Sequence, residues 1–135
     1  MKYMLDTNIC IYLINKKPKS VLTKFKTLKL GDIGISSVTL AELMYGVQKS
    51  QHQQTNQIAL SEFTLPLEIA AFDEEASAHY GVIRAQLEKR GTPIGALDLM
   101  IAAHARSLKS ILVTNNKKEF QRVAGLSIED WVHKH

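Results

Sequence analysis

The sequence lacks several features that mark common classes of protein. It contains one cysteine, Cys10, so no internal disulfide can form, and a reducing cytoplasm is the expected location. No apolar run approaches the roughly 20 residues of a membrane-spanning helix. The opening MKYMLDTN does not resemble a signal peptide, because its apolar run is short and is interrupted by Asp6. We therefore expect a cytoplasmic protein that does not engage a membrane.

The chain also has no internal repeat and no low-complexity segment. Its 135 residues suit a single domain, residues 1–135. The first apolar run is followed by DTN and not by a glycine-rich phosphate loop, which argues against a standard nucleotide-binding fold. The net charge of +4 is compatible with a polyanionic partner, although the lysines can equally form solvated helix faces.

Short apolar runs alternate with segments of helical periodicity. This order predicts an α/β fold with a mostly parallel sheet, covered on both faces by helices. Ligands of such sheets collect at the carboxyl ends of the strands. The expected strands are Tyr3–Asp6, Ile33–Ser36, Leu67–Phe72, Ser110–Thr114 and Leu126–Asp130; the expected helices run from Thr7 or Asn8 to Asn15, Pro18–Leu28, Ser36 or Ser37 to Gln48, Thr55–Phe63, Glu74–Arg90, Ala96–Leu108 and Lys117–Val123, with a polar loop or frayed helix end at Ser50–Asn56 and a loop at Gly91–Gly95.

Three acidic residues lie in unusually apolar surroundings. Asp6 ends the first expected strand, Glu42 lies within VTLAELMYGV, and Asp98 lies within IGALDLMIAAHA. An unpaired buried carboxylate costs several kcal/mol, and no basic residue lies within a helical turn of Glu42 or Asp98. A divalent cation can compensate such charges, and Mg²⁺ prefers carboxylate oxygens. The sequence therefore predicts a Mg²⁺ site at the carboxyl edge of the sheet, which Mn²⁺ can also occupy.

Each of these acids also has an ordinary explanation. Thr39 and Glu42 match a capping box, Asp98 suits the first turn of a helix, and Asp6 can cap the helix that follows it. Taken together, these explanations are weaker, because capping does not require the helices to be apolar all round.

The segments MLDTN, ISSVTLAEL, GTPIGALDLMIAAHA and ILVTNNKKEF, in this order, resemble the PIN-domain nucleases. Within them, the chain is most similar to the VapC toxins of bacterial toxin–antitoxin systems. The resemblance implies a three-layer α/β/α sandwich, with Asp6, Glu42 and Asp98 at the family's three leading acidic positions. Many relatives carry a fourth acid as T-x-D, whereas this chain has Asn116 there. Glu119 is an alternative source of that carboxylate, so the number of metal ions stays open.

The same resemblance implies a function. The expected activity is Mg²⁺-dependent hydrolysis of RNA phosphodiester bonds by a toxin that inhibits translation. A transfer RNA is the expected substrate, the initiator tRNA included. The implied partners are a cognate VapB-type antitoxin, a second copy of the chain in a homodimer, and operator DNA bound only through the antitoxin, all in the bacterial cytoplasm.

Further residues are predicted to support this chemistry. Asn116 and Glu119 are expected to join the catalytic acids, and Thr114 and Ser37 to position a water or a phosphate oxygen. Basic side chains are expected to contact the RNA backbone, with a solvated surface as the alternative. These are Lys16, Lys17, Arg84 and Lys117.

No histidine is required, so His79 and His104 are expected to be structural or surface residues. The apolar residues Ile9, Leu13 and Ile14, with the face from Ala41 to Val47, are expected either in the core or at a groove or dimer contact.

Two other functions remain open at this point. A two-carboxylate glycosidase using Glu42 and Asp98 would work without metal. A non-catalytic α/β nucleotide-binding or regulatory module would need none of the three acids.

Overall fold

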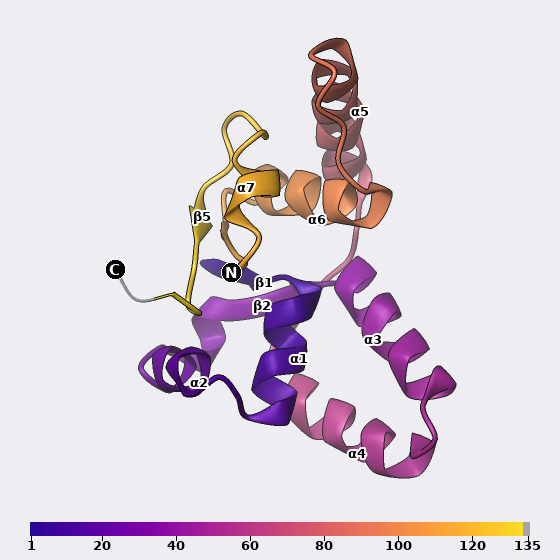
Figure 1. Ribbon diagram of the computed structural model, residues 1–135, viewed down its shortest axis with the longest axis vertical. Helices are drawn as coiled ribbons and strands as arrows, with labels where there is room; N and C mark the ends of the chain where they lie inside the picture. Colours follow the sequence, from indigo (N-terminus) through magenta and orange to yellow (C-terminus); the bar gives the residue numbers. More distant parts are fainter. Residues whose placement is uncertain (134–135) are drawn as a thin grey trace.

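A five-stranded parallel sheet forms the centre of the protein, which is described here by a computed structural model covering residues 1–133. The strand order is β3-β2-β1-β4-β5, and every neighbouring pair is parallel (Figure 1). β1 is the central strand and β4 is one of its two neighbours, so their carboxyl ends lie side by side. The strands are β1 (Tyr3–Leu5), β2 (Ile33–Ser36), β3 (Glu68–Ala70), β4 (Ile111–Val113) and β5 (Ile128–Glu129).

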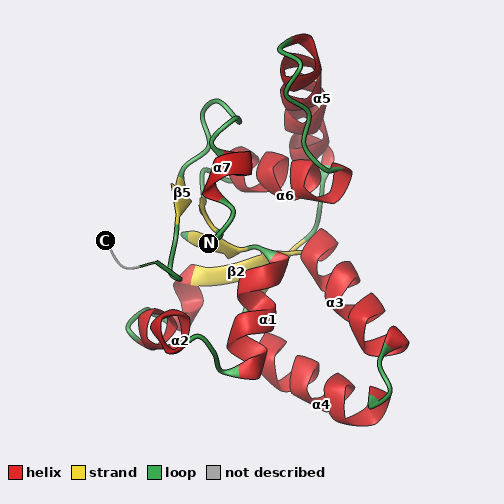
Figure 2. Ribbon diagram, viewed as in Figure 1, coloured by secondary structure: helices red, strands yellow, loops and turns green. Residues whose placement is uncertain are grey.

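Helices cover both faces of this sheet (Figure 2). Helices α1, α2 and α4 lie on one side, and α5, α6 and α7 lie on the other. Helix α3 leaves the sheet at the end of β2 and contacts both α1 and α6. The helices are α1 (Thr7–Asn15), α2 (Lys19–Lys26), the short 3₁₀ turn η1 (Leu30–Asp32), α3 (Ser37–Lys49), α4 (Gln53–Thr64), α5 (Glu74–Lys89), α6 (Ala96–Ser107) and α7 (Lys117–Phe120).

The core is divided into two halves by the sheet. Successive side chains of a strand point to opposite faces, so Tyr3 and Leu5 of β1 pack with the first half of the chain and Met4 packs against α5 and α6. All three residues are buried, as expected for a parallel strand covered on both faces. This arrangement confirms the predicted three-layer α/β/α sandwich.

Element boundaries differ from the sequence prediction mainly at the periphery. The polar segment Ser50–Asn56 is not a loop throughout, because α4 begins at Gln53. Glutamine is a good helix former, and Leu60 anchors this helix in the core. Strand β3 is shorter than predicted, and its residues are largely exposed at the sheet edge. Among residues 1–133, every helix is too short or too polar to span a membrane.

Candidate metal centre

Asp6 lies at the carboxyl end of β1, where its side chain is only 5% exposed. Its Oδ1 accepts a hydrogen bond from the Ile9 main-chain N–H at 2.9 Å, so Asp6 does cap α1. Burial raises its pKa to about 6; hydrogen bonds from Thr114 and Ile9 oppose the rise, and the charge on Glu42 adds to it. Capping therefore accounts for one oxygen of Asp6 but does not neutralise the buried group.

Asp98 lies in the first turn of α6 and is the acid most affected by its neighbours. Burial, a hydrogen bond with Glu119 and the charge on Glu119 raise its pKa to about 7, with smaller contributions from Asp6 and Glu42. Carboxylates from four separate elements are thus close enough to influence one another. The structure brings together the three acids chosen from the sequence and Glu119, the alternative fourth carboxylate.

Glu42 faces this group from α3. Its Oε1 accepts a hydrogen bond from the Thr7 hydroxyl at 2.7 Å. The capping-box interpretation of Glu42 is wrong, because Ser36 caps α3 by accepting from the Val38 N–H at 3.0 Å. Within residues 1–133, the Thr39 hydroxyl is buried without a hydrogen-bond partner. Thr7, expected from the sequence only as a possible first residue of a helix, directly follows Asp6 and contributes to this site through Glu42.

In the turn after β4, Asn116 occupies the position where many relatives carry a fourth acid. The Asn116 main-chain N–H donates to the Thr114 hydroxyl at 3.0 Å, and the Asn116 side-chain amide donates to Glu119 Oε2 at 2.8 Å. Glu119, one helical turn later, hydrogen-bonds with Asp98. Asn116 thus orients a carboxylate instead of supplying one.

The charges of these four acids are not offset by basic side chains. The ion pairs within residues 1–133 involve other carboxylates, such as Glu88 and Glu129. In the same range, however, no three Asp, Glu, His or Cys side chains are arranged to hold an ion as they stand. Glu42 and Glu119 each accept a hydrogen bond from a neighbour, Thr7 and Asn116 respectively.

The donor set nevertheless fits a hard divalent cation. Glu119 Oε1 and Asn115 Oδ1 are both buried, and no N–H or hydroxyl group of the described residues donates to either; the carboxyl of Asp98 is the other hydrogen-bonding neighbour of Glu119. Buried polar atoms of this kind are rare in folded proteins. Mg²⁺ and Mn²⁺ prefer oxygen ligands. Such an ion would offset the negative charge of carboxyl groups whose pKa values are raised, and would give the buried oxygens a partner.

The other predicted site residues are placed unevenly. The Ser37 hydroxyl accepts a hydrogen bond from the Phe72 N–H at 3.0 Å and lies on the same groove as Glu42. Lys117 begins α7, directly after Asn116. The remaining basic residues lie elsewhere: Lys16 and Lys17 follow the end of α1 that is opposite Asp6, about 13 Å away along the helix, and Arg84 on α5 donates to Glu88 and Tyr80 at 3.0 and 2.8 Å.

The histidines have structural roles, as predicted. His104 is buried with its Nδ1 2.8 Å from the Ser36 hydroxyl oxygen, and burial lowers its pKa. His79 accepts a hydrogen bond from Arg106 Nε at 2.8 Å. Ile9 and Leu13 are buried, which confirms the core alternative for them.

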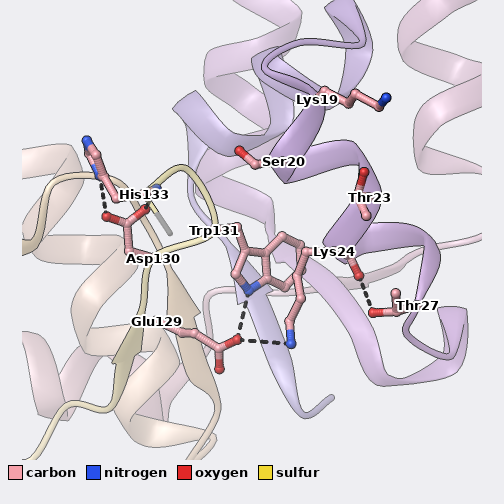
Figure 3. Close-up of a pocket in the computed structure, with 9 residues that line it drawn as sticks. All are labelled: Lys19, Ser20, Thr23, Lys24, Thr27, Glu129, Asp130, Trp131 and His133. Atoms are coloured by element: carbon pink, nitrogen blue, oxygen red, sulfur yellow. Dashed lines mark hydrogen bonds and ion pairs between the residues drawn. The ribbon is translucent and has the colours of Figure 1, made fainter. Parts of the chain in front are cut away.

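A second cavity, of about 910 Å³, lies between α2 and the segment after β5 (Figure 3). Its acidic residues are paired with neighbouring groups. Asp130 accepts from the Val132 N–H at 2.8 Å and is 2.6 Å from His133 Nδ1. Glu129 Oε1 accepts from Trp131 Nε1 at 3.0 Å and lies 3.7 Å from Lys24 Nζ.

Comparison with known proteins gives consistent matches over almost the whole chain. The family profile of the PIN domain matches residues 3–126. The chain is 50% identical over 131 residues to the tRNA(fMet)-specific endonuclease VapC of Shigella flexneri, covering 97% of this chain and 98% of that protein. It is 48% identical over 132 residues to the ribonuclease VapC2 of Rickettsia felis, covering 97% and 98%.

Solved structures of similar sequence also share this fold. The structure of VapBC2 from Rickettsia felis bound to a promoter DNA fragment superposes with a TM-score of 0.91 at 48% identity, covering 97% of this chain and 99% of that one. The DNA-bound VapBC structure from Salmonella typhimurium gives a TM-score of 0.92 at 44% identity, covering 97% and 98%.

Proposed function

Because this chain belongs to the PIN-domain family, and within it to the VapC group, we propose that it is a metal-dependent endoribonuclease toxin. One observation carries the proposal from the structure. Asp6, Glu42, Asp98 and Glu119 influence one another at the carboxyl edge of the sheet, and the pKa of Asp98 is raised to about 7. An arrangement that destabilises its own ionised form is typical of a functional site.

In this proposal Asp6, Asp98 and Glu42 hold Mg²⁺ or Mn²⁺, and Glu119 provides the fourth carboxylate. Such an ion, when bound, favours the ionisation of water and offsets negative charge on a phosphate. The protein's own residues prepare the donors. Thr114 keeps Asp6 in place, and Asn116 orients Glu119. Asp98, whose pKa is raised to about 7, would release its proton on holding such an ion.

The substrate and partners follow from the relatives. The Shigella relative carries the name of a tRNA(fMet)-specific endonuclease, so we propose a transfer RNA as substrate and the initiator tRNA as the first one to test. The Rickettsia and Salmonella structures are VapBC complexes with DNA. We therefore propose a VapB-type antitoxin as partner, with operator DNA reached through it, and a homodimer in the bacterial cytoplasm.

The decisive experiment measures cleavage of total bacterial RNA and of purified initiator and elongator tRNAs. The protein is first treated with EDTA and then supplied with Mg²⁺ or Mn²⁺. Cleavage should be absent with EDTA, return with either ion and be strongest for the initiator tRNA. Cutting that persists in EDTA would contradict the metal requirement, and equal cutting of all tRNAs would contradict the substrate.

Added Mg²⁺ should also stabilise the fold, which tests the metal site without any substrate. An ion that binds only the folded state adds about 2.7 kcal/mol at a hundred times its dissociation constant. Urea unfolding with and without Mg²⁺ measures this gain. Asp98→Asn should lose most of it.

A further inference from the structure

A groove of about 800 Å³ extends from the candidate metal centre along α3. Thr7, Glu42 and Lys49 all line this groove. Helix α3 runs away from the sheet in Figure 1, and residues along its length, from Ser37 to Lys49, line the groove. Lys49 is seven positions after Glu42, which is about 10 Å along a helix.

The walls of the groove are largely apolar although they face solvent. Ile11 of α1 is 40% exposed, Leu97 of α6 is 46% exposed, and Tyr45 of α3 is 66% exposed. Exposed apolar side chains gathered on one concave surface indicate a binding site. Apolar walls suit the flat face of a nucleic-acid base better than they suit its charged backbone.

Tyr45 and Lys49 form a pair within this groove. The Lys49 ammonium lies 5.3 Å from the centroid of the Tyr45 ring. A cation on one face of an aromatic ring leaves the opposite face open to a stacked base. The same ammonium can contact a phosphate, so the pair offers both kinds of contact that unpaired RNA uses.

We propose that this groove binds the nucleotide next to the scissile phosphate, with its base stacked on Tyr45 and a phosphate near Lys49. The inference rests on the proposed ribonuclease function, because Glu42 belongs to both the groove and the metal centre. This inference assigns substrate binding to α3. The lysines selected from the sequence, Lys16 and Lys17, instead follow the end of α1 that is opposite Asp6.

The test measures RNA binding in EDTA, so that cleavage does not interfere. Fluorescence anisotropy is recorded with labelled oligoadenylate and oligouridylate, because purines stack more strongly than pyrimidines. We expect the parent protein to prefer oligoadenylate. Tyr45→Ala should weaken its binding about tenfold and abolish the preference, whereas Tyr45→Phe should retain both. Leu65→Ala, at a residue that is 86% exposed outside the groove, is the matched control and should change nothing.

Lys49→Gln should weaken both oligonucleotides equally. A lost phosphate contact also lowers the slope of log affinity against log salt by about 0.7 for a single strand. This behaviour separates the ammonium contact from stacking, which leaves the salt slope unchanged.

The outcomes separate this inference from the function beneath it. If the parent binds neither oligonucleotide, the groove inference fails, and the ribonuclease function is decided separately by cleavage of the tRNAs. If the parent binds and Tyr45→Ala binds equally well, only the groove inference fails. Sedimentation of each variant is the final check: a Tyr45→Ala protein that loses RNA binding together with its oligomeric state would assign the groove to a protein–protein interface and overturn the inference.

Discussion

Asp6 and Asp130 occupy equivalent places in the sheet yet behave in opposite ways. Each directly follows a strand of the same parallel sheet, β1 or β5, and they are only 5% and 8% exposed. The pKa of Asp6 is raised to about 6. Burial also acts to raise the pKa of Asp130, but hydrogen bonds from His133 and from the Val132 and His133 N–H groups outweigh it and lower that pKa.

The difference lies in the neighbours, because both side chains are buried. Asp130 meets an imidazole and two main-chain donors, so its ionised form stabilises the fold. Burial is the largest cause of the raised pKa of Asp6, its hydrogen bonds do not outweigh burial, and the charge on Glu42 adds to the rise, so its ionised form opposes folding until a cation is present. The hydrogen-bond partners thus decide whether a buried acid stabilises or opposes the fold in its ionised form. Two acids that look alike in sequence should therefore respond oppositely to substitution, pH and metal.

The largest effect should come from replacing an acid of the candidate metal centre by its amide, compared with the same replacement at Asp130. Asp98→Asn and Asp6→Asn should lower the rate of RNA cleavage more than about 100-fold, since even residues that only support a metal ligand cost 10- to 100-fold. Both variants should fold at least as stably as the parent without metal, because a repulsion is removed. Asp130→Asn should cleave RNA normally but lose about 1–3 kcal/mol of unfolding free energy.

Cleavage rates and urea unfolding curves measure the two sides of this prediction. A folded Asp130→Asn protein without activity, or an Asp98→Asn protein with full activity, would break the comparison.

The pH dependence of stability should also differ between the two acids. For metal-free protein, Asp6 should lower the free energy of unfolding by about 3 kcal/mol as the pH rises from about 4 to about 6. The pKa of Asp98, raised to about 7, should extend the decline in the same direction. The sign follows because folded Asp6 retains its proton in this range while the unfolded carboxyl loses it near pH 3.9. Asp130 has a lowered pKa, so its contribution is present above about pH 4 and is lost as the pH falls further.

Urea unfolding in EDTA at stepped pH values measures this profile. Asp6→Asn should reduce the decline and leave the part due to Asp98, and Asp130→Asn should leave the whole decline in place. Stability that rises with pH in this window would show that Asp6 is compensated after all.

A smaller effect should distinguish Asn116 from His133. Each of them hydrogen-bonds an acidic side chain three positions away, Glu119 and Asp130 respectively. Asn116 donates to Glu119 at 2.8 Å, and His133 is 2.6 Å from Asp130. Asn116→Ala should weaken Mn²⁺ binding by about 10- to 100-fold, because the supported carboxylate loses its orientation. His133→Ala should leave Mn²⁺ affinity unchanged and cost about 1 kcal/mol of stability.

Calorimetric titration with Mn²⁺ and urea unfolding provide these values. Unchanged Mn²⁺ affinity in Asn116→Ala would exclude Glu119 from the ligand set.

The smallest effect should come from the ion pair beside Asp130. Lys24 Nζ lies 3.7 Å from Glu129 Oε1, and both side chains are about one-third exposed or more. Such pairs contribute less than about 1 kcal/mol. Lys24→Met should therefore change stability by less than this amount and leave cleavage unaltered. A larger loss of stability, measured by thermal unfolding against the parent, would show that the charges around this cavity matter more than those of an ordinary surface.

Much of the candidate site was predictable, because an acidic residue within an apolar segment can be recognised from the sequence alone. Asp6, Glu42 and Asp98 stand out because each is an acid within an apolar pattern, and Glu42 and Asp98 have no basic residue within a helical turn. The RNA-contacting residues are harder to predict, because a lysine on a solvated helix face produces no such conflict. Asp130 gives no signal for a related reason, since its partner His133 lies only three residues away and a local pairing looks ordinary.

The sequence by itself determined the alternation of strands and helices, the two-sided burial of β1 and the acids whose placement requires compensation, because periodicity and local composition are written along the chain. Only the tertiary structure decided that Glu119 reaches Asp98, that Thr7 rather than a capping box engages Glu42, and that the groove beside them carries Tyr45 and Lys49. These relations join residues from different elements, and their energies depend on distance and burial, which exist only after the sheet has brought those elements together.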